Sequence, residues 1–251
     1  MGSWKKRLYL PGSIIPFELS RTKLELFMKC PRCFFLDRRT DIKTSDGFGL
    51  NLNLAVDALL KKEFDIYRER GTPHPLMKRY GISAIPFSHP DLSTWRENFK
   101  GIQFLHTPTN LIVFGAVDDI WVGRDSTLFV VDYKATSTSK QIILGGEYGE
   151  SYKRQMEIYQ WLLRKNGFTV SDTGYFVYVN ATKDRDRFSA RLEFKEEIIP
   201  YVGNDAWIEP APFGAHECLN GELPRASSSC GHCKYIEKVI LFLKGQEKLS
   251  S

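Results

Sequence analysis

Residues 111–136, LIVFGAVDDIWVGRDSTLFVVDYKAT, decide how this chain folds. Two runs rich in β-branched and aromatic residues flank the turn GRDS at 123–126, which predicts a β-hairpin. Three charged residues interrupt its apolar surface: Asp118, Asp132 and Lys134. Alternate side chains of a strand share a face, so Asp132 and Lys134 are expected on the same side of the sheet. Asp118, at the matching depth of the partner strand, can reach the same place.

Two carboxylates brought to one place repel each other unless a cation sits between them. Mg²⁺ and Mn²⁺ are hard cations that accept such oxygen ligands. The adjacent lysine suits an attacking water or the charge that develops on a phosphate. The alternative is a hairpin with charges exposed on its polar face, because an Asp-x-Lys triplet on a strand is common by chance.

Three motifs follow one another along the chain: Gly115-x-x-Asp118, Asp132-Tyr133-Lys134, and Gln155-x-x-x-Tyr159 on a following helix. In this order and spacing the sequence resembles the PD-(D/E)XK nuclease superfamily, in the RecB-like branch that includes the CRISPR-associated RecB-like exonucleases. The resemblance covers about residues 19–235. It implies a restriction-endonuclease-like core of the α/β (α+β) class, with a mixed central β-sheet flanked by helices.

The resemblance also implies roles for the motif residues. Asp118, Asp132 and the main-chain carbonyl of Tyr133 would bind one or two Mg²⁺ or Mn²⁺ ions. Lys134 would orient and help deprotonate the attacking water, or stabilise charge on the phosphate. Gln155 and Tyr159, four residues apart on one helix face, would line the site and hold substrate or water.

A helix is expected over residues 53–70, and it departs from the pattern of the relatives. They usually place a manganese-binding histidine there, but none of the five histidines of this chain lies on it. Asp57 stands where the histidine would be, with Glu63 as an alternative nearer the end of the helix. A carboxylate would keep a metal ligand at this position. Equally, Asp57 can be a solvated helix residue.

The five cysteines form a second constellation. Four of them make two C-x-x-C pairs, Cys30 with Cys33 and Cys230 with Cys233, one ahead of the core and one behind it. Each pair can grip a metal from two sides of a short turn, and two pairs supply four thiolates. They can meet only if the two ends of the chain pack together. Cys218 is a reserve ligand.

RecB-like nucleases of the CRISPR-associated and AddB types carry a [4Fe–4S] cluster, usually with one cysteine before the nuclease core and three after it. Here the arrangement is two plus two, with Cys33 in place of the missing third cysteine. The resemblance therefore implies a [4Fe–4S] cluster, with structural Zn²⁺ as the alternative. A third reading is that the cysteines are buried small apolar residues. His232, between two cysteines, is expected to be an exposed loop histidine.

Local patterns predict the remaining elements. Ser20 or Thr22 can cap a helix that carries Leu24 on its apolar stripe, with a break near Cys30 because Pro31 fits poorly inside a helix. The other expected elements are short helices and loops over 71–110, a mobile loop over 140–149, a helix over 151–166 ended by Gly167, strands over 174–180 and 188–194, a helix around Trp207, and a last helix to about 248.

Length and composition point to a globular protein. With 251 residues and 42% hydrophobic residues the chain can build one core, so residues 1–251 are expected to form a single domain. Within it, 19–40 and 218–248 would form the cysteine subregion and 111–194 the catalytic core. The net charge of +5 suits a phosphate-backbone partner. No apolar run approaches the roughly 20 residues that span a membrane, and MGSWKKRLYLPGS lacks a signal-peptide core, so a cytoplasmic location without membrane contact is expected.

The resulting hypothesis is a metal-dependent DNA nuclease, an exonuclease or a nuclease of single-stranded ends. It would act in DNA repair, recombination or CRISPR-related processing, with proteins of those systems as partners. Two alternatives stay open: a non-catalytic DNA-binding or assembly module with the same fold, and a small zinc-stabilised interaction protein whose hairpin charges have no catalytic role.

Overall fold

The computed structural model describes residues 8–44 and 51–247. The chain divides into two compact units. The first comprises Met1–Gly47, Leu105–Ile112 and Pro210–Ser251, and the second comprises Phe48–Phe104 and Val113–Glu209. The four clustered cysteines belong to the first unit and the residues of the PD-(D/E)XK-like motifs to the second. Among the described residues, no helix is both long and apolar enough to cross a bilayer.

A five-stranded mixed sheet forms the centre of the second unit. Its strands are β2 (Ala84–Pro86), β5 (Asp119–Gly123), β6 (Leu128–Thr136), β7 (Thr173–Ala181) and β8 (Phe194–Val202). They lie in the order β2-β5-β6-β7-β8, and every neighbouring pair is antiparallel except β6 and β7, which are parallel. A parallel pair needs a long crossover, and helix α6 (Gly146–Lys165) supplies it. The predicted mixed sheet flanked by helices is confirmed.

The predicted hairpin is confirmed for β5 and β6, which pair from Asp119 opposite Val131 to Val122 opposite Leu128. In its turn the carboxylate of Asp125 accepts hydrogen bonds from the amide of Thr127 at 3.1 Å and from its hydroxyl at 2.9 Å. The first part of the quoted stretch behaves differently. Strand β4 (Leu111–Gly115) belongs to a separate three-stranded sheet of order β1-β4-β3, and the chain bends at residues 116–118 before it enters β5.

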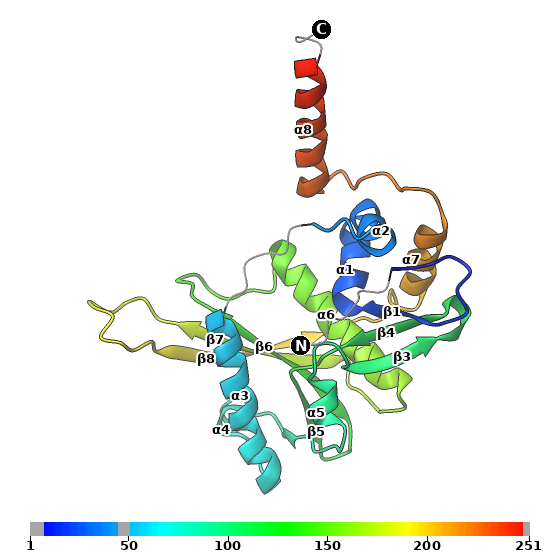
Figure 1. The fold of residues 1–251 in the computed structure, drawn as a ribbon. Coiled ribbons are helices and arrows are strands. Elements are labelled where there is room, and N and C mark those ends of the chain that lie inside the picture. The colour runs from blue at the N-terminus through cyan, green and yellow to red at the C-terminus, as the bar shows by residue number, and fades with distance from the viewer. Residues whose placement is uncertain (1–7, 45–50, 248–251) are drawn as a thin grey trace, which may run out of the picture. The chain divides into compact units, whose positions relative to one another are not determined.

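Helix α3 (Asn51–Arg70) covers one face of the five-stranded sheet (Figure 1). Leu60 and Phe64 of this helix are buried against Val131 and Tyr133 of β6 and neighbouring residues of β7. The helix was predicted over 53–70 and is confirmed. Because β6 residues alternate between faces, Asp132 and Lys134 point to the opposite face, the side on which α6 contacts β6.

Helix α6 begins five residues earlier than predicted and therefore shortens the expected loop over 140–149. It ends as predicted before Gly167, which has φ of +88°. Strand β7 is confirmed, but the predicted strand over 188–194 is wrong, because residues 188–193 connect β7 to a β8 that begins at Phe194. The charges and the proline of β8 hide it in the sequence, and an edge strand tolerates both.

The region predicted as short helices and loops also contains strands. It forms α4 (Pro75–Arg79), β2, α5 (Leu92–Trp95), β3 (Ile102–His106) and the 3-10 helix η1 (Thr107–Thr109). Trp207 lies in a turn and not in the expected helix, which begins three residues later as α7 (Pro210–Asn220).

In the first unit, helices α1 (Arg21–Lys29), α2 (Pro31–Arg39) and α7 pack together (Figure 1), and β1 (Phe17–Ser20) precedes them. Ser20 caps α1 by accepting a hydrogen bond from the amide of Lys23 at 3.4 Å. The predicted break at Cys30 is confirmed: this residue ends α1, and Pro31 opens α2, where its missing N–H costs nothing. Helix α8 (Gly231–Glu247) is the predicted last helix.

Candidate functional site

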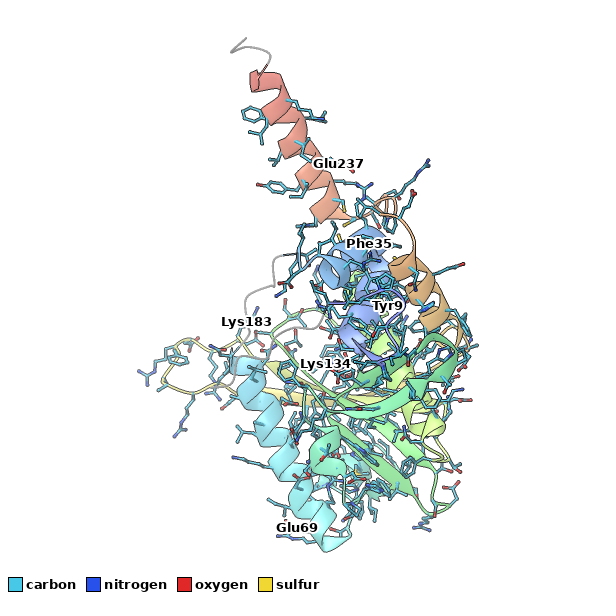
Figure 2. The ribbon with its side chains drawn as sticks, turned by 45° about the vertical axis from the view of Figure 1, so that its right-hand side comes forward. Tyr9, Phe35, Glu69, Lys134, Lys183 and Glu237 are labelled. Carbon is cyan, nitrogen blue, oxygen red and sulfur yellow. The ribbon has the colours of Figure 1, made fainter. Side chains whose placement is uncertain are left out.

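Strand β6 presents two of the predicted side chains, Asp132 and Lys134, on one face of the sheet, where Lys134 is labelled in Figure 2. Asp132 is fully buried, and its Oδ1 accepts a hydrogen bond from Nε2 of Gln155 at 2.8 Å. The ammonium of Lys134 forms an ion pair with Oδ2 of Asp132 and lies 3.5 Å from Oε1 of Gln155. Asp132 and Lys134 therefore form an ion pair, and Gln155 of α6 contacts both members of it.

Asp118 reaches the same place from the bend before β5. Its Oδ2 accepts a hydrogen bond from the backbone N–H of Tyr133 at 3.0 Å. Tyr133 lies between Asp132 and Lys134 in β6, so this bond fixes the Asp118 carboxylate beside both of them. The structure thus brings together the two carboxylates and the lysine of the first two motifs.

Helix α3 adds Asp57 and a residue that sequence reasoning missed, Lys61. The ammonium of Lys61 lies 2.8 Å from Oδ2 of Asp57 and 3.1 Å from Oδ1 of Asp118, so it bridges the two carboxylates. The available signal was the spacing of four residues between Asp57 and Lys61, which favours a helical ion pair. Glu63, the alternative to Asp57, instead lies 3.0 Å from Nε2 of His74.

Helix α6 supplies the third motif. Gln155 donates from Nε2 to Asp132, as described, and the same nitrogen lies 3.2 Å from the hydroxyl of Tyr159. One turn earlier, the ring of Tyr152 lies with its centroid 4.5 Å from Nζ of Lys134, a cation–π distance. From the sequence, Tyr152 was expected only as one of the residues that recur at helical spacing on this helix and not as a site residue, although it is three residues before Gln155 and thus shares its helix face.

Three carboxylates and two ammonium groups meet here, and their charges shift the pKa of Asp57, Asp118 and Lys134. Burial raises the pKa of Asp57, and the charge of Asp118 adds to this. Burial alone would raise the pKa of Asp118, but Lys61 and Lys134 lower it overall. Burial would likewise lower the pKa of Lys134, but Asp132 and Asp118 raise it. Formal charges leave an excess of one negative charge on hard oxygen donors, which fits a divalent cation.

A buried ionic network supports this site from behind. Nε of Arg96 donates to the main-chain oxygen of Asp118 at 3.0 Å, and Nη2 of Arg96 lies 3.0 Å from Oδ1 of Asp119. The other oxygen of Asp119, which is fully buried, accepts a hydrogen bond from the hydroxyl of Tyr133 at 2.8 Å. Arg96 therefore holds the backbone of Asp118, a predicted metal ligand. Through Asp119 it also holds the side chain of Tyr133, the residue that precedes Lys134.

A second carboxylate and a second guanidinium complete the network. Nη1 of Arg96 lies 2.9 Å from both oxygens of Asp65. Arg68 donates from Nε to Asp65 at 3.0 Å and from Nη2 to Asp119 at 2.5 Å. Two arginines thus neutralise two carboxylates, of which Asp119 is fully buried and Asp65 is partly exposed. The Asp118-Asp119 doublet was the sequence signal for this network, but nothing local pointed to its arginine partners.

The four cysteines of the two C-x-x-C pairs meet in the first unit. Their Sγ atoms all lie within 4.8 Å of one another. Sγ of Cys33 lies 3.5 Å from that of Cys233 and 3.6 Å from that of Cys230, and Sγ of Cys30 lies 3.8 Å from that of Cys233. Burial would raise the pKa of Cys30, but backbone hydrogen bonds from Ser227 and Cys33 lower it to about 6. Burial raises the pKa of Cys33, and it raises that of Cys233 to about 11. The predicted two-plus-two grouping is confirmed.

The two neighbouring candidates lie outside this group. Sγ of Cys218 lies 3.7 Å from the main-chain oxygen of Pro31, and burial raises its pKa to about 11. It does not belong to the four-cysteine group. His232 was predicted as an exposed loop residue, but it lies in the first turn of α8 and is half-buried, because the helix begins at Gly231.

Comparisons with known proteins identify the family. No curated protein matches the chain. Among solved structures it is similar to the crystal structure of SSO0001, with a TM-score of 0.36 and 16% sequence identity, over 80% of this chain and 75% of that one. The sequence matches the PD-(D/E)XK nuclease superfamily over residues 18–237. Since this match spans most of the sequence, the chain belongs to the PD-(D/E)XK nuclease superfamily.

Proposed function

We propose that this protein is a metal-dependent deoxyribonuclease that hydrolyses phosphodiester bonds. One observation carries the proposal: the amide of Tyr133 ties Asp118 to the strand on which Asp132 and Lys134 form an ion pair. Carboxylates held this close to two lysines are poorly explained as structural charges. They suit a divalent cation and a reacting phosphate.

The proposed Mg²⁺ or Mn²⁺ ligands are Asp57, Asp118, Asp132 and the main-chain carbonyl of Tyr133. All three side chains offer carboxylate oxygens, and Asp57 and Asp118 already share one cation, the ammonium of Lys61. When bound, the metal would polarise the phosphate and lower the pKa of the attacking water.

The protein's own groups would orient the reactants. Lys134, held by Asp132 and flanked by the ring of Tyr152, would direct its ammonium toward the attacking water or the phosphate oxygens. Gln155 would keep Asp132 in place through its 2.8 Å hydrogen bond, and with Tyr159 it would line the site. Lys61 would provide a second positive charge near the phosphate.

The finer assignment rests on the sequence resemblance. We place the protein in the RecB-like branch, as an exonuclease or an enzyme that processes single-stranded ends. On the same basis we propose a role in DNA repair, recombination or CRISPR-related processing, together with other proteins of those systems, in the cytoplasm.

We further propose that Cys30, Cys33, Cys230 and Cys233 hold one metal centre. The resemblance supports a [4Fe–4S] cluster. The sulfur separations support the alternative, a single structural Zn²⁺, because a tetrahedron of thiolates about 2.3 Å from zinc has edges of roughly 3.8 Å, and three Sγ pairs lie 3.5 to 3.8 Å apart. Anaerobic purification separates the two: iron and sulfide give a brown protein, whereas zinc gives a colourless one.

The function is tested by incubating the protein with end-labelled single-stranded and duplex DNA in Mg²⁺, Mn²⁺ or EDTA. We expect cleavage with a divalent ion and none with EDTA. Asp132→Asn keeps the shape and the hydrogen bond to Gln155 but removes the charged ligand, so it should abolish cleavage while the protein stays folded. Metal-independent cleavage, or full activity of Asp132→Asn, would refute the proposal.

A further inference from the structure

The sheet face that carries Asp132 and Lys134 continues as a polar row near the end of β6. Thr136 follows them on the same face, because alternate residues of a strand point the same way. The strand register pairs Thr136 with Asn180 of β7 and pairs Asn180 with Lys195 of β8. Directly paired residues of neighbouring strands share a face, so the row crosses three strands on the side of the candidate active site.

This row borders a groove at the base of the β7–β8 hairpin, whose connection is seen in Figure 1 extending away from the sheet. The groove has a volume of about 450 Å³ and is lined by residues 138–141, 180–184 and 195, which we call the lysine groove. A second hollow of about 230 Å³ shares Lys140, Gln141, Asn180 and Lys195 with it and is otherwise lined by Tyr80, Ile142, Glu196 and Glu197. Polar residues dominate the lining, so the groove is not a site for an apolar ligand.

Asn180 fixes the loop that forms one wall of the lysine groove. Its Oδ1 accepts a hydrogen bond from the amide of Thr138 at 2.9 Å, and its Nδ2 donates to the main-chain oxygen of Thr138 at 2.9 Å. The hydroxyl of Ser137 donates to the main-chain oxygen of Ala181 at 3.2 Å. The loop after β6 is thus held against β7, and the wall of the groove does not depend on a ligand.

The charges of the lysine groove are predominantly positive. Lys140, Lys183 and Lys195 line it, against one carboxylate, that of Asp184, so its formal charge is +2. All three lysines are exposed, and within the described part of the chain none of them forms an ion pair. Figure 2 labels Lys183 in the connection that follows β7. Ammonium, hydroxyl and amide groups are those that proteins use to contact DNA phosphates.

The spacing from Lys134 fits one continuous strand of DNA. Thr136, the last residue of β6, is two residues beyond Lys134, which at about 3.3 Å per residue of strand corresponds to roughly 7 Å, and Thr138 of the groove follows two residues later. Nucleotides of one DNA strand in a duplex are about 3.4 Å apart along the helix axis, so the distance from Lys134 to the end of β6 spans about two nucleotides. A strand whose reacting phosphate lies at Lys134 would therefore reach the groove within a few nucleotides.

We propose that the lysine groove binds the phosphates of the DNA strand that enters the candidate active site, a few nucleotides from the bond that is cut. This proposal rests on the proposed nuclease function. Ammonium and hydroxyl groups on phosphates carry no sequence information, so the contact is independent of base sequence and weakens with salt.

The test measures binding of a fluorescein-labelled 20-nucleotide single-stranded DNA by anisotropy between 50 and 300 mM NaCl. All proteins carry Asp132→Asn so that the DNA stays intact. The groove variant adds Lys140→Gln, Lys183→Gln and Lys195→Gln. A matched control replaces three exposed lysines elsewhere, Lys100, Lys238 and Lys244, by glutamine and therefore has the same net charge.

We expect the groove variant to bind about 10- to 100-fold more weakly at low salt, with the slope of log K against log[salt] smaller by about 2 for three lost contacts to a single strand. The control should keep the slope of the parent. An unchanged slope and Kd in the groove variant, or an equal loss in the control, overturns the proposal. If the triple variant fails to fold, Lys183→Gln alone is compared with the parent instead, because Lys183 lies in an exposed connection. One lost phosphate contact should then reduce the slope of log K against log[salt] by less than 1.

The outcome for the groove is separable from that for the proposed function. If the wild-type protein cleaves DNA but the groove variant binds like the parent, only the groove assignment fails. If the groove variant loses salt-dependent binding but the wild-type protein never cleaves DNA with any metal, the nuclease assignment fails and the groove remains a DNA-binding surface.

Discussion

Tyr133 connects the proposed metal ligands to the buried network behind them through two of its groups. Its amide donates to Asp118 on the side of the proposed metal ligands, and its hydroxyl donates to Asp119 in the buried network. Burial, together with the charge of Asp119, raises the pKa of Tyr133, so the hydroxyl stays a donor. Tyr133, predicted from the sequence only as a carbonyl ligand, thus also holds the carboxylates of Asp118 and Asp119.

Lys134 is expected to act on the chemical step and not on the metal. Lys134→Ala removes the ammonium that pairs with Asp132, so the carboxylates should bind a cation at least as well as before, while the water or phosphate loses its positive partner. We expect the single-turnover rate at saturating Mn²⁺ to fall by about 10² to 10⁴. Rates and calorimetric Mn²⁺ affinity would be compared with Lys153→Ala, which removes an α6 lysine paired with Glu150. Lost Mn²⁺ affinity with an unchanged rate would contradict this role.

Gly101 illustrates a position that the backbone reserves for glycine. It has φ of +64°, and a Cβ there would lie 2.3 Å from the carbonyl oxygen of Gly115. Gly81 has a similar φ of +66° but nothing within 4 Å of a Cβ. Gly81→Ala should therefore lose about 1 to 2 kcal/mol of unfolding free energy from the left-handed conformation alone. Gly101→Ala should lose about 2 kcal/mol more through the clash. Urea denaturation of both variants measures these losses. Equal losses of unfolding free energy would show that the backbone near Gly115 moves to make room for the added methyl group at little cost.

Among the elements, the connection after α5 controls the bend that precedes β5. Arg96 is its key residue, because it donates to the main-chain oxygen of Asp118 while pairing with Asp119 and Asp65. A lysine has the same charge but cannot make these bonds at once, since they need the planar fork of a guanidinium. Arg96 is thus a positioning residue for the proposed metal ligands.

Arg96→Lys is therefore expected to change both stability and metal dependence. The lost hydrogen bonds of a buried pair should cost about 3 kcal/mol of unfolding free energy. The displaced Asp118 should raise the Mn²⁺ concentration for half-maximal cleavage several-fold. Arg79→Lys, at an exposed arginine, is the control, and urea denaturation and Mn²⁺ titration of the rate are the measurements. A loss of stability with unchanged metal dependence would make Arg96 a purely structural residue.

The sequence predicted those elements whose signals are local. The β5–β6 hairpin follows from its turn residues, α3 from its length and terminal glycine, and the end of α6 from Gly167. Strand β8 was placed too early because its charged residues and proline interrupt the alternation, and β2, with three residues, is too short to show one. Lys61 was missed for another reason: its partner Asp118 is 57 residues away, and only the packing of α3 beside the sheet brings them together.

At the scale of the whole molecule, four free cysteines bring together two segments that are far apart in the sequence. Cys30 and Cys233 are 203 residues apart in sequence, yet their Sγ atoms lie 3.8 Å apart. The repeated C-x-x-C spacing predicted this meeting, because two ligands per pair complete a four-thiolate site. The identity of the bound metal could not be predicted, since thiolates suit both zinc and iron–sulfur clusters.

If the four cysteines hold one centre, its loss should destabilise the protein strongly. The centre closes a loop of about two hundred residues, and restricting so long a loop in the unfolded chain contributes about 5 kcal/mol by comparison with a disulfide. Cys230→Ser should therefore yield metal-depleted and poorly soluble protein, with a melting temperature far below that of the wild type. Cys218→Ser should keep its metal and solubility, because Cys218 contacts Pro31 and lies outside the group. Zinc, iron and sulfide analysis of both variants is the measurement. If Cys218→Ser lost its metal while Cys33→Ser kept it, Cys218 and not Cys33 would be the fourth ligand.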